Sequence, residues 1–240
     1  GHGRLARRMA AAGMRVTGVD ATPAYLEMAR SDPKLPPDGV TYLEGDVRAL
    51  PVTGPFDAVV CWLNSFGYYD DADCHRVLEE FHRVLRPGGT VVFAGEPSRY
   101  GDRLARIPKR AAAAAAPLWR RAIGAAPVAP VDANGDHHAA DHALESEVDI
   151  HAFAPAELAD FAARAGLVEV RVSGEELLAN WFGWTNRVLE STAAPEDIPW
   201  AWRQYAFRGY LALQRLDTRL LEPRLPARIF YNLLLTARRP

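Results

Sequence analysis

The sequence of 240 residues lacks several features that define whole classes of proteins. It has only two cysteines, Cys61 and Cys74, and neither has a metal-type neighbour. A disulfide framework and a zinc cluster are therefore not expected, and both thiols are predicted to lie in a core in a reducing compartment. No apolar run reaches the length of a membrane span, and no secretory signal is recognisable. The sequence therefore predicts a cytoplasmic protein.

An excess of charge of one sign is also lacking. The formal net charge is −2, so the overall balance recruits neither nucleic acid nor an acidic membrane surface. The basic pairs Lys109-Arg110 and Arg120-Arg121 are most simply exposed surface charge, with contact to an anionic substrate or a membrane surface as the alternative. A hydrophobic share of 49% in 240 residues is enough for one well-buried domain.

The order of short apolar runs and periodic segments predicts an α/β fold. Gly1 to Met9 reads as a glycine loop that opens into a helix, and Thr22-Pro23 is typical of a second helix start. Asp71 or Asp73 is expected to cap a third helix, and a fourth is predicted from Pro155 to Ala165. Strands are predicted between these helices and near the C-terminus, at 15–20, 40–44, 56–62, 90–94, 168–172 and 229–237. This alternation predicts a doubly wound, mostly parallel sheet.

Two stretches interrupt the alternation. Residues 96–150 hold a basic stretch, six consecutive alanines and a polar loop, and residues 174–228 include a long helix with an apolar stripe. We predict that both are insertions that cover the substrate pocket of a single domain spanning residues 1–240. Pairing of the long helix with a second subunit is the alternative, so both a monomer and a homodimer remain open.

The glycine loop and the acid that ends the next strand predict a cofactor site. Glycine lets the backbone approach a ligand closely, and a carboxylate at the position of Asp20 can accept hydrogen bonds from ribose hydroxyls. Gly1-x-Gly3-x-x-Ala6 with Asp20 also fits a dinucleotide fingerprint. A nicotinamide-dependent oxidoreductase is therefore one alternative, and a non-catalytic cofactor-binding protein is another.

Later motifs, in their order along the chain, discriminate between these alternatives. Gly45-Asp46-Val47 after the strand predicted at 40–44, the run PVTGPFDAVVCWLNSFGYY, and HRVLRPGG together resemble the class I S-adenosylmethionine-dependent methyltransferase family. The family's loop reads acid-x-Gly-x-Gly-x-Gly, and Gly1 and Gly3 match its last two glycines. The resemblance therefore implies a Rossmann-like methyltransferase fold whose first strand and first loop glycine are missing from this sequence.

The resemblance also implies the roles of individual residues. Gly1 and Gly3 would line the methionine and ribose part of S-adenosylmethionine, and Asp20 would hold the ribose diol beside Ala21. The residues implied at the adenine and methionyl ends are Asp46, Val47, Trp62 and Leu63.

The acceptor is expected to be a small molecule, bound at the carboxyl ends of the strands. Some of the residues predicted to contact it lie in the tyrosine-rich segment after the strand predicted at 56–62, and others in an aromatic cluster in the second insertion. They are Asn64, Phe66, Tyr68, Tyr69, Trp181 and Trp184. His151 is the candidate catalytic base, because oxygen and carbon nucleophiles often need one. His137, His138 and His142 lie in a polar loop, so no metal site is predicted.

Overall fold

The computed structural model describes residues 1–32, 39–62, 65–97, 101–128 and 151–240. The side chains of 101–105 lie outside this description. In chain order the helices are α1 (Arg4–Ala11), α2 (Pro23–Ser31), α3 (Asp71–Val84), α4 (Gly101–Ile123), α6 (Pro155–Arg164), α7 (Leu178–Glu190) and α8 (Trp200–Leu216). The strands are β1 (Val16–Asp20), β2 (Val40–Glu44), β3 (Phe56–Cys61), β4 (Leu85–Gly95), β5 (Val168–Glu175) and β6 (Asn232–Arg238). The predicted α/β class is confirmed.

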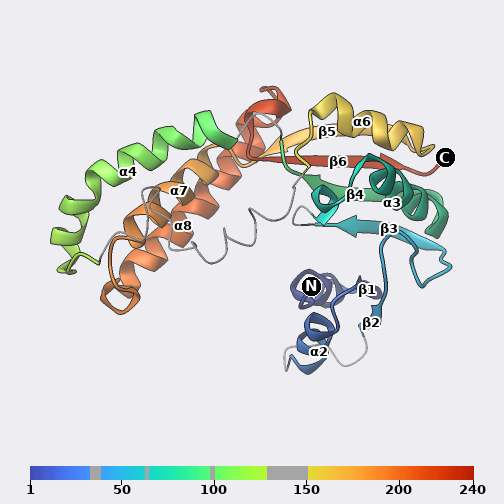
Figure 1. Ribbon diagram of the computed structural model, residues 1–240, viewed down its shortest axis with the longest axis horizontal. Coiled ribbons are helices and arrows are strands. Elements are labelled where there is room, and N and C mark those ends of the chain that lie inside the picture. The colour runs from blue at the N-terminus through green and yellow to red at the C-terminus, as the bar shows by residue number, and fades with distance from the viewer. Residues whose placement is uncertain (33–38, 63–64, 98–100, 129–150) are drawn as a thin grey trace.

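The strands form two sheets. β1 and β2 pair in parallel, and a second sheet has the order β3-β4-β6-β5, in which β6 runs antiparallel to both of its neighbours. β1 and β3 each have one edge without a strand partner among the described residues. The described strands are thus divided between two sheets, and the helices α1 and α2 lie with the smaller one (Figure 1).

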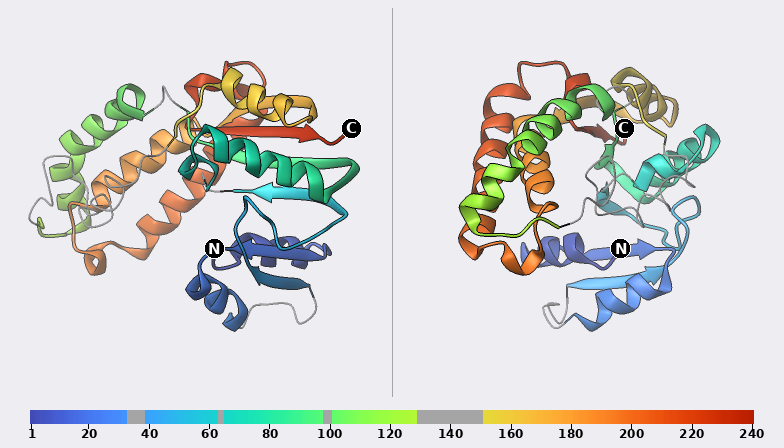
Figure 2. Two further views of the ribbon diagram at one scale, coloured as in Figure 1. Left: turned by 45° about the vertical axis from the view of Figure 1, so that its right-hand side comes forward. Right: turned by 60° about the vertical axis from the view of Figure 1, so that its left-hand side comes forward.

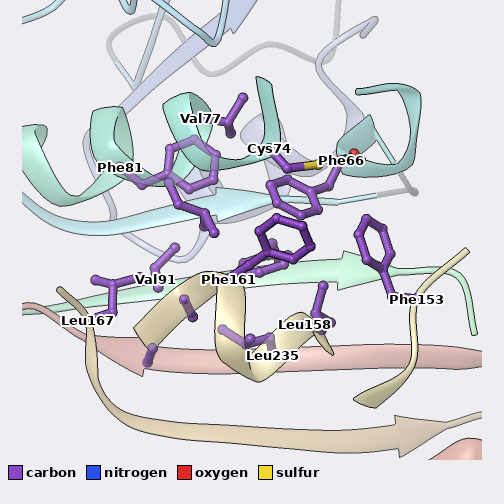
Figure 3. Close-up of a cluster of buried hydrophobic side chains, with 14 of the residues drawn as sticks. Phe66, Cys74, Val77, Phe81, Val91, Phe153, Leu158, Phe161, Leu167 and Leu235 are labelled. Atoms are coloured by element: carbon purple, nitrogen blue, oxygen red, sulfur yellow. Dashed lines mark hydrogen bonds between the residues drawn. The ribbon is translucent and has the colours of Figure 1, made fainter. Parts of the chain in front are cut away.

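The main core lies between the four-stranded sheet and the two helices α3 and α6. Phe66, Phe93 and Phe153 are fully buried in it, with ring centroids of Phe66 4.7 Å from Phe93 and 5.4 Å from Phe153 (Figure 3). Cys74 is buried in the same cluster, and burial first of all raises the pKa of its thiol to about 12. Burial likewise raises the pKa of Cys61 to about 11. Both cysteines are free thiols, as predicted.

Helix starts follow local sequence rules with one correction. α3 is capped by Asp70, whose side chain accepts a hydrogen bond of 2.8 Å from the Asp73 amide. Asp71 and Asp73, the predicted caps, instead lie in its first turn, where negative charge favours the helix dipole. α2 begins as predicted, with Thr22 at the cap and Pro23 in the first turn.

Helices α4, α7 and α8 form a separate layer beside the sheet, which we call the cap (Figures 1 and 2). α7 lies between the other two and contacts both. The cap has its own buried cluster, which includes Ala116 and Trp119 of α4 and Leu189 of α7. α4 comes from the first predicted insertion and α7 and α8 from the second, so the two insertions pack on one another.

The cap joins the sheet through a group of carboxylates. Glu175 ends β5, next to Glu176, and Glu222 follows the helical segment 217–221 after α8. Burial is the main cause that raises the pKa of Glu175 from 4.5 to about 7, and the nearby charges of Glu222 and Glu176 add to it. The folded state therefore holds a proton on Glu175 that the unfolded chain releases.

This proton predicts that stability depends on pH. The contribution of Glu175 is fully present below pH 4.5 and is lost as the pH rises to about 7, since there the unfolded chain binds fewer protons than the folded one. For a fully buried side chain, the pKa shift of Glu175 would correspond to a larger change in the free energy of unfolding. Because this side chain is partly solvated, we expect the free energy of unfolding to fall by about 1–2 kcal/mol over this pH range. Urea unfolding at pH 5, 6, 7 and 8 should give a flatter profile for Glu175→Gln. Glu169→Gln on the same strand is the control and should follow the unmodified profile; equal slopes for all three proteins would contradict the prediction.

Candidate cofactor and acceptor site

The glycine turn at the start of the chain packs on the middle of β2. Gly3 caps α1 with φ of +75°, a conformation that favours glycine. A Cβ at Gly3 would clash with the hydroxyl of Tyr42, which is buried and has no hydrogen-bond partner in the described structure. The ring of Tyr42 crosses Gly18 of β1, where a Cβ would lie 3.0 Å from its Cδ1. Tyr42 was not among the predicted site residues, although glycine inside a strand is a signal of such a close approach.

Asp20 lies at the carboxyl end of β1, beside the glycine turn. Its Oδ1 accepts a hydrogen bond of 2.8 Å from the Thr22 amide, and its Oδ2 contacts the Gly1 ammonium. Burial works to raise the pKa of Asp20, but hydrogen bonds to the carboxylate, among them that from the Thr22 amide, outweigh it and hold the pKa below the ordinary value. The carboxylate is therefore ionised and serves only as an acceptor, which suits a ribose diol. Ala21 follows it in an exposed position.

Asp46 lies next to Asp20 across the parallel strand pair, because the Gly45 amide donates a hydrogen bond of 3.1 Å to the Asp20 carbonyl. The carboxylate of Asp46 is bound by the Arg48 guanidinium at 2.6–3.1 Å, which is the main cause of its lowered pKa. Arg48 also reaches Asp73 of α3 at 2.6 Å. The predicted adenine acceptor is thus already paired with an arginine. Val47 is half-buried against the main core.

The segment after β3 holds several of the predicted contacts. Trp62 is 39% exposed directly after the strand, while Leu63 and Asn64 lie outside the described residues. Tyr68 is exposed, and Tyr69 is half-buried with the Arg48 guanidinium 5.7 Å from its ring centroid.

The prediction for Phe66 is wrong. The short 3-10 helix Ser65–Tyr68 turns this side chain into the main core, where it is fully buried against Phe93 and Phe153 (Figure 3). Its place in the tyrosine-rich segment after a strand had suggested an acceptor contact, but an apolar ring next to a large core is more stable when buried.

His151 lies beside the same segment. Its amide donates a hydrogen bond of 2.7 Å to the Gly67 carbonyl, and its ring stacks on Phe153 with centroids 4.2 Å apart. Nε2 lies 3.1 Å from Glu157 Oε1, and Nδ1 lies 3.5 Å from Asp71 Oδ1. Glu157 is held in place because its other oxygen accepts a hydrogen bond of 2.9 Å from the Ala154 amide.

The aromatic cluster of the second insertion lies in α7, inside the cap. Trp184 is flanked by two cations, with Lys109 Nζ 4.0 Å and the Arg187 guanidinium 5.1 Å from its ring centroid. The indole N–H groups of Trp181 and Trp184 are buried without a hydrogen-bond partner in the described part of the chain. These two tryptophans are therefore half-buried cap residues with unused donors.

The described residues hold no metal-ligand group at this site, and the pocket that they form lies elsewhere. Among the described residues no group of three or more metal-ligating side chains is close enough to hold an ion, and His137, His138 and His142 lie outside the description. An open pocket of about 450 Å³ is bordered by residues 50–54, Phe56 and Arg83. It lies at the amino end of β3, opposite to Trp62, and so away from the predicted cofactor residues.

Solved structures of other proteins share the fold of this chain. The solved structure of an S-adenosylmethionine-dependent methyltransferase from Thermotoga maritima, described as a possible histamine N-methyltransferase, has a TM-score of 0.53 at 16% identity and covers 100% of this chain and 78% of that one. The [4+2]-cyclase SpnF has a TM-score of 0.53 at 18% identity, covering 100% of this chain and 72% of its own. The fold is that of the class I methyltransferases.

The sequence comparisons match the N-terminal part of the chain. Residues 1–89 match the family described as "Methyltransferase domain". The demethylmenaquinone methyltransferase of Thermus thermophilus is 40% identical over 88 residues, which is 36% of this chain and 39% of that protein. The sequence match to methyltransferases therefore covers the first 89 of the 240 residues. The chain spans about two fifths of the length of the curated relatives it matches.

Proposed function

We propose that this protein is an S-adenosylmethionine-dependent methyltransferase that acts on a small molecule in the cytoplasm. The observation that carries the proposal is the ionised carboxylate of Asp20 beside the glycine turn, within the segment that matches the family. The relative from Thermus thermophilus is named for demethylmenaquinone, a small molecule, which supports the acceptor class. No helix in the described ranges is long and apolar enough to cross a membrane.

The described residues fit the cofactor at its ribose end. We assign the ribose diol to Asp20, next to Ala21, and the methionyl part to the turn of Gly1 and Gly3, where no Cβ can be accommodated at Gly3. We place Trp62 and Leu63 near the methionyl end, and Asp46 and Val47 near the adenine. In this assignment the Asp46 carboxylate accepts a hydrogen bond from the adenine while it stays paired with Arg48. A carboxylate has enough lone pairs for both.

The protein's part in the reaction is to align the reactants. The cofactor, when bound, supplies a methyl group that is already activated for transfer. The residues around it then have to orient the acceptor and exclude water. We assign Tyr68, Tyr69 and Asn64 to the acceptor side, with Trp181 and Trp184 contributing from the cap, which we interpret as a cover formed by the insertions 96–150 and 174–228 of one domain.

The test of the cofactor class is isothermal titration of the full-length protein with S-adenosylhomocysteine, alongside NADH and NADPH. Micromolar binding of S-adenosylhomocysteine and none of the dinucleotides is expected. The reverse pattern would support the oxidoreductase alternative. Binding that is followed by no turnover on small-molecule, protein or RNA acceptors would favour a non-catalytic protein.

We propose His151 as the base that removes the acceptor's proton. The Glu157 carboxylate needs a donor, so it holds the proton on Nε2 and leaves Nδ1 free to accept one. Asp71, which faces Nδ1, has a side chain that is 77% exposed and can turn away.

His151→Gln is therefore expected to lower kcat roughly 100-fold, the lower end of general-base effects, and to leave the Kd of S-adenosylhomocysteine unchanged. His75→Gln, which changes a partly exposed histidine on α3, is the control. Unchanged kcat in His151→Gln would show that the histidine only supports the neighbouring turn.

A further inference from the structure

The near-neutral net charge of the chain hides a strong separation of charge. Residues 101–123, which form α4, and residues 200–228, which begin with α8, together hold twelve Lys and Arg residues and three acidic residues. These two segments carry a net charge of +9, so the remainder of the chain carries −11. Of the three acids Asp217 is fully buried, which leaves the surface of α8 still more basic.

The same helix exposes large apolar side chains. No residue of α8 is fully buried, and Trp200 is 72%, Phe207 59% and Tyr205 56% exposed. The inner side of α8 packs on α7, where a Cβ at Gly209 would lie 2.7 Å from the Phe182 ring. Tyr205 lies at the edge of this contact, with its ring centroid 5.7 Å from that of Phe182, while Trp200 and Phe207 belong to the side of α8 that has no described partner.

Arginines and apolar side chains are interleaved on this exposed side. Tyr205, Arg208, Ala212 and Arg215 follow one another at spacings of three and four, so they share one face of the helix, and all are exposed. Toward the C-terminus, Leu216 and Leu220 are 39% and 47% exposed and extend the apolar part of this surface.

α4, on the other side of the cap, also exposes both apolar and basic side chains. Ile107 and Leu118 are 56% and 70% exposed, and Arg110 and Arg121 are exposed as well. α4 and α8 are joined where Trp119 packs edge-on against Trp202, with ring centroids 5.2 Å apart. Figure 1 shows the two helices on either side of α7, away from β1 and β2.

We propose that the cap, through α8 and the adjoining part of α4, binds the surface of a membrane that contains anionic lipids. Tryptophan, tyrosine and phenylalanine bind at the boundary between headgroups and acyl chains, and arginine pairs with lipid phosphates. A helix that exposes both kinds of side chain, without spanning the bilayer, has the composition of an interfacial helix. The exposed leucines and isoleucine favour lipid over nucleic acid, because nucleobases stack on aromatic rings and gain little from aliphatic side chains.

A second copy of the chain fits the exposed surface of α8 less well than an anionic membrane does. A two-fold interface brings the same patch of both subunits together, so it would place the arginines of α8 against their own copies. An anionic surface, in contrast, compensates the charge of each of them.

The test is sedimentation of the full-length protein with vesicles. Vesicles of 30% phosphatidylglycerol in phosphatidylcholine are expected to bind the protein at 0.1 M salt, and pure phosphatidylcholine vesicles are expected to bind much less. Because each arginine near an anionic surface contributes about 1 kcal/mol, Arg208→Gln with Arg215→Gln should weaken binding by about 25-fold. Trp200→Ser with Phe207→Ser should weaken it by roughly tenfold at any salt concentration, since the apolar contribution is not screened.

The matched control changes two exposed arginines on helices outside the cap, Arg76 and Arg164, to glutamine. This variant has the same net charge as the α8 double variant and should bind vesicles as the unmodified protein does. Equal binding to both vesicle types, equal loss in the control, or a stable dimer that dissociates on changing Arg208 and Arg215 would each overturn the proposal. Tighter binding to single-stranded RNA than to the anionic vesicles would also overturn it.

Discussion

Asp20→Ala is expected to weaken S-adenosylhomocysteine binding on the order of 100-fold, because two hydrogen bonds to an ionised carboxylate are lost and each contributes roughly 1.5 kcal/mol or more. The carboxylate is the acceptor at the end of β1, and the Thr22 amide occupies only part of its capacity. Isothermal titration measures the change directly. Asp20→Asn keeps one acceptor oxygen and should retain an intermediate affinity.

Controls separate a lost contact from a damaged fold. Asp57→Ala removes a carboxylate that is 87% exposed at the start of β3, where it pairs with Arg86, so the affinity should stay within a factor of two. Thermal unfolding should show Asp20→Ala within about 1 kcal/mol of the unmodified protein, the usual limit for losing a capping bond. Unchanged affinity in Asp20→Ala, with binding intact in the unmodified protein, would remove the ribose assignment while leaving the cofactor class in place.

The order of the elements could be predicted from sequence because it depends on local patterns. The apolar run at 56–61 and the periodic positions of Val77, Leu78 and Phe81 determine β3 and α3 without reference to the rest of the chain. The division into two sheets depends on whether the edges of β1 and β3 meet a strand, and periodicity within each strand carries no information about that.

The site was predictable to a smaller extent, for a related reason. Asp20 ends a strand that local sequence patterns predict. Its place near the glycine turn could therefore be predicted as well. The burial of Phe66 depends on Phe93 and Phe153, which are 27 and 87 positions further along the chain. Likewise the pairing of Asp46 with Arg48, and of Arg48 with Asp73, is decided by side-chain reach in the folded molecule.

Asp217 is the clearest residue that sequence reasoning missed. In the sequence it is one acid at the end of a long helix, but in the structure it is fully buried and accepts three backbone hydrogen bonds, from Leu177 at 3.0 Å, Leu178 at 3.1 Å and Ala179 at 2.9 Å. These amides begin α7, so Asp217 caps that helix from 40 positions away. The carboxylate thereby fixes how α8 and α7 meet at the junction of cap and sheet.

Asp217→Ala is therefore expected to lower the free energy of unfolding by about 3–5 kcal/mol, because three buried donors lose their partner and the start of α7 loses its negative charge. Urea unfolding monitored by tryptophan fluorescence measures the change, and it reports on the cap in particular, since Trp181, Trp184 and Trp202 all lie there. Asp217→Asn should lose roughly half as much, because its one carbonyl oxygen can still accept while its NH₂ group faces donors.

The matched control for Asp217 is Asp197→Ala. Asp197 is an exposed cap acid whose side chain lies at the surface before α8, so its loss should change the free energy of unfolding by less than about 0.5 kcal/mol. If Asp217→Ala were as stable as this control, α7 would have to begin without its buried cap. The contact of α7 with α8 would then depend on apolar packing such as that of Phe182 against Gly209 and Tyr205, and Gly209→Leu would become the more damaging change.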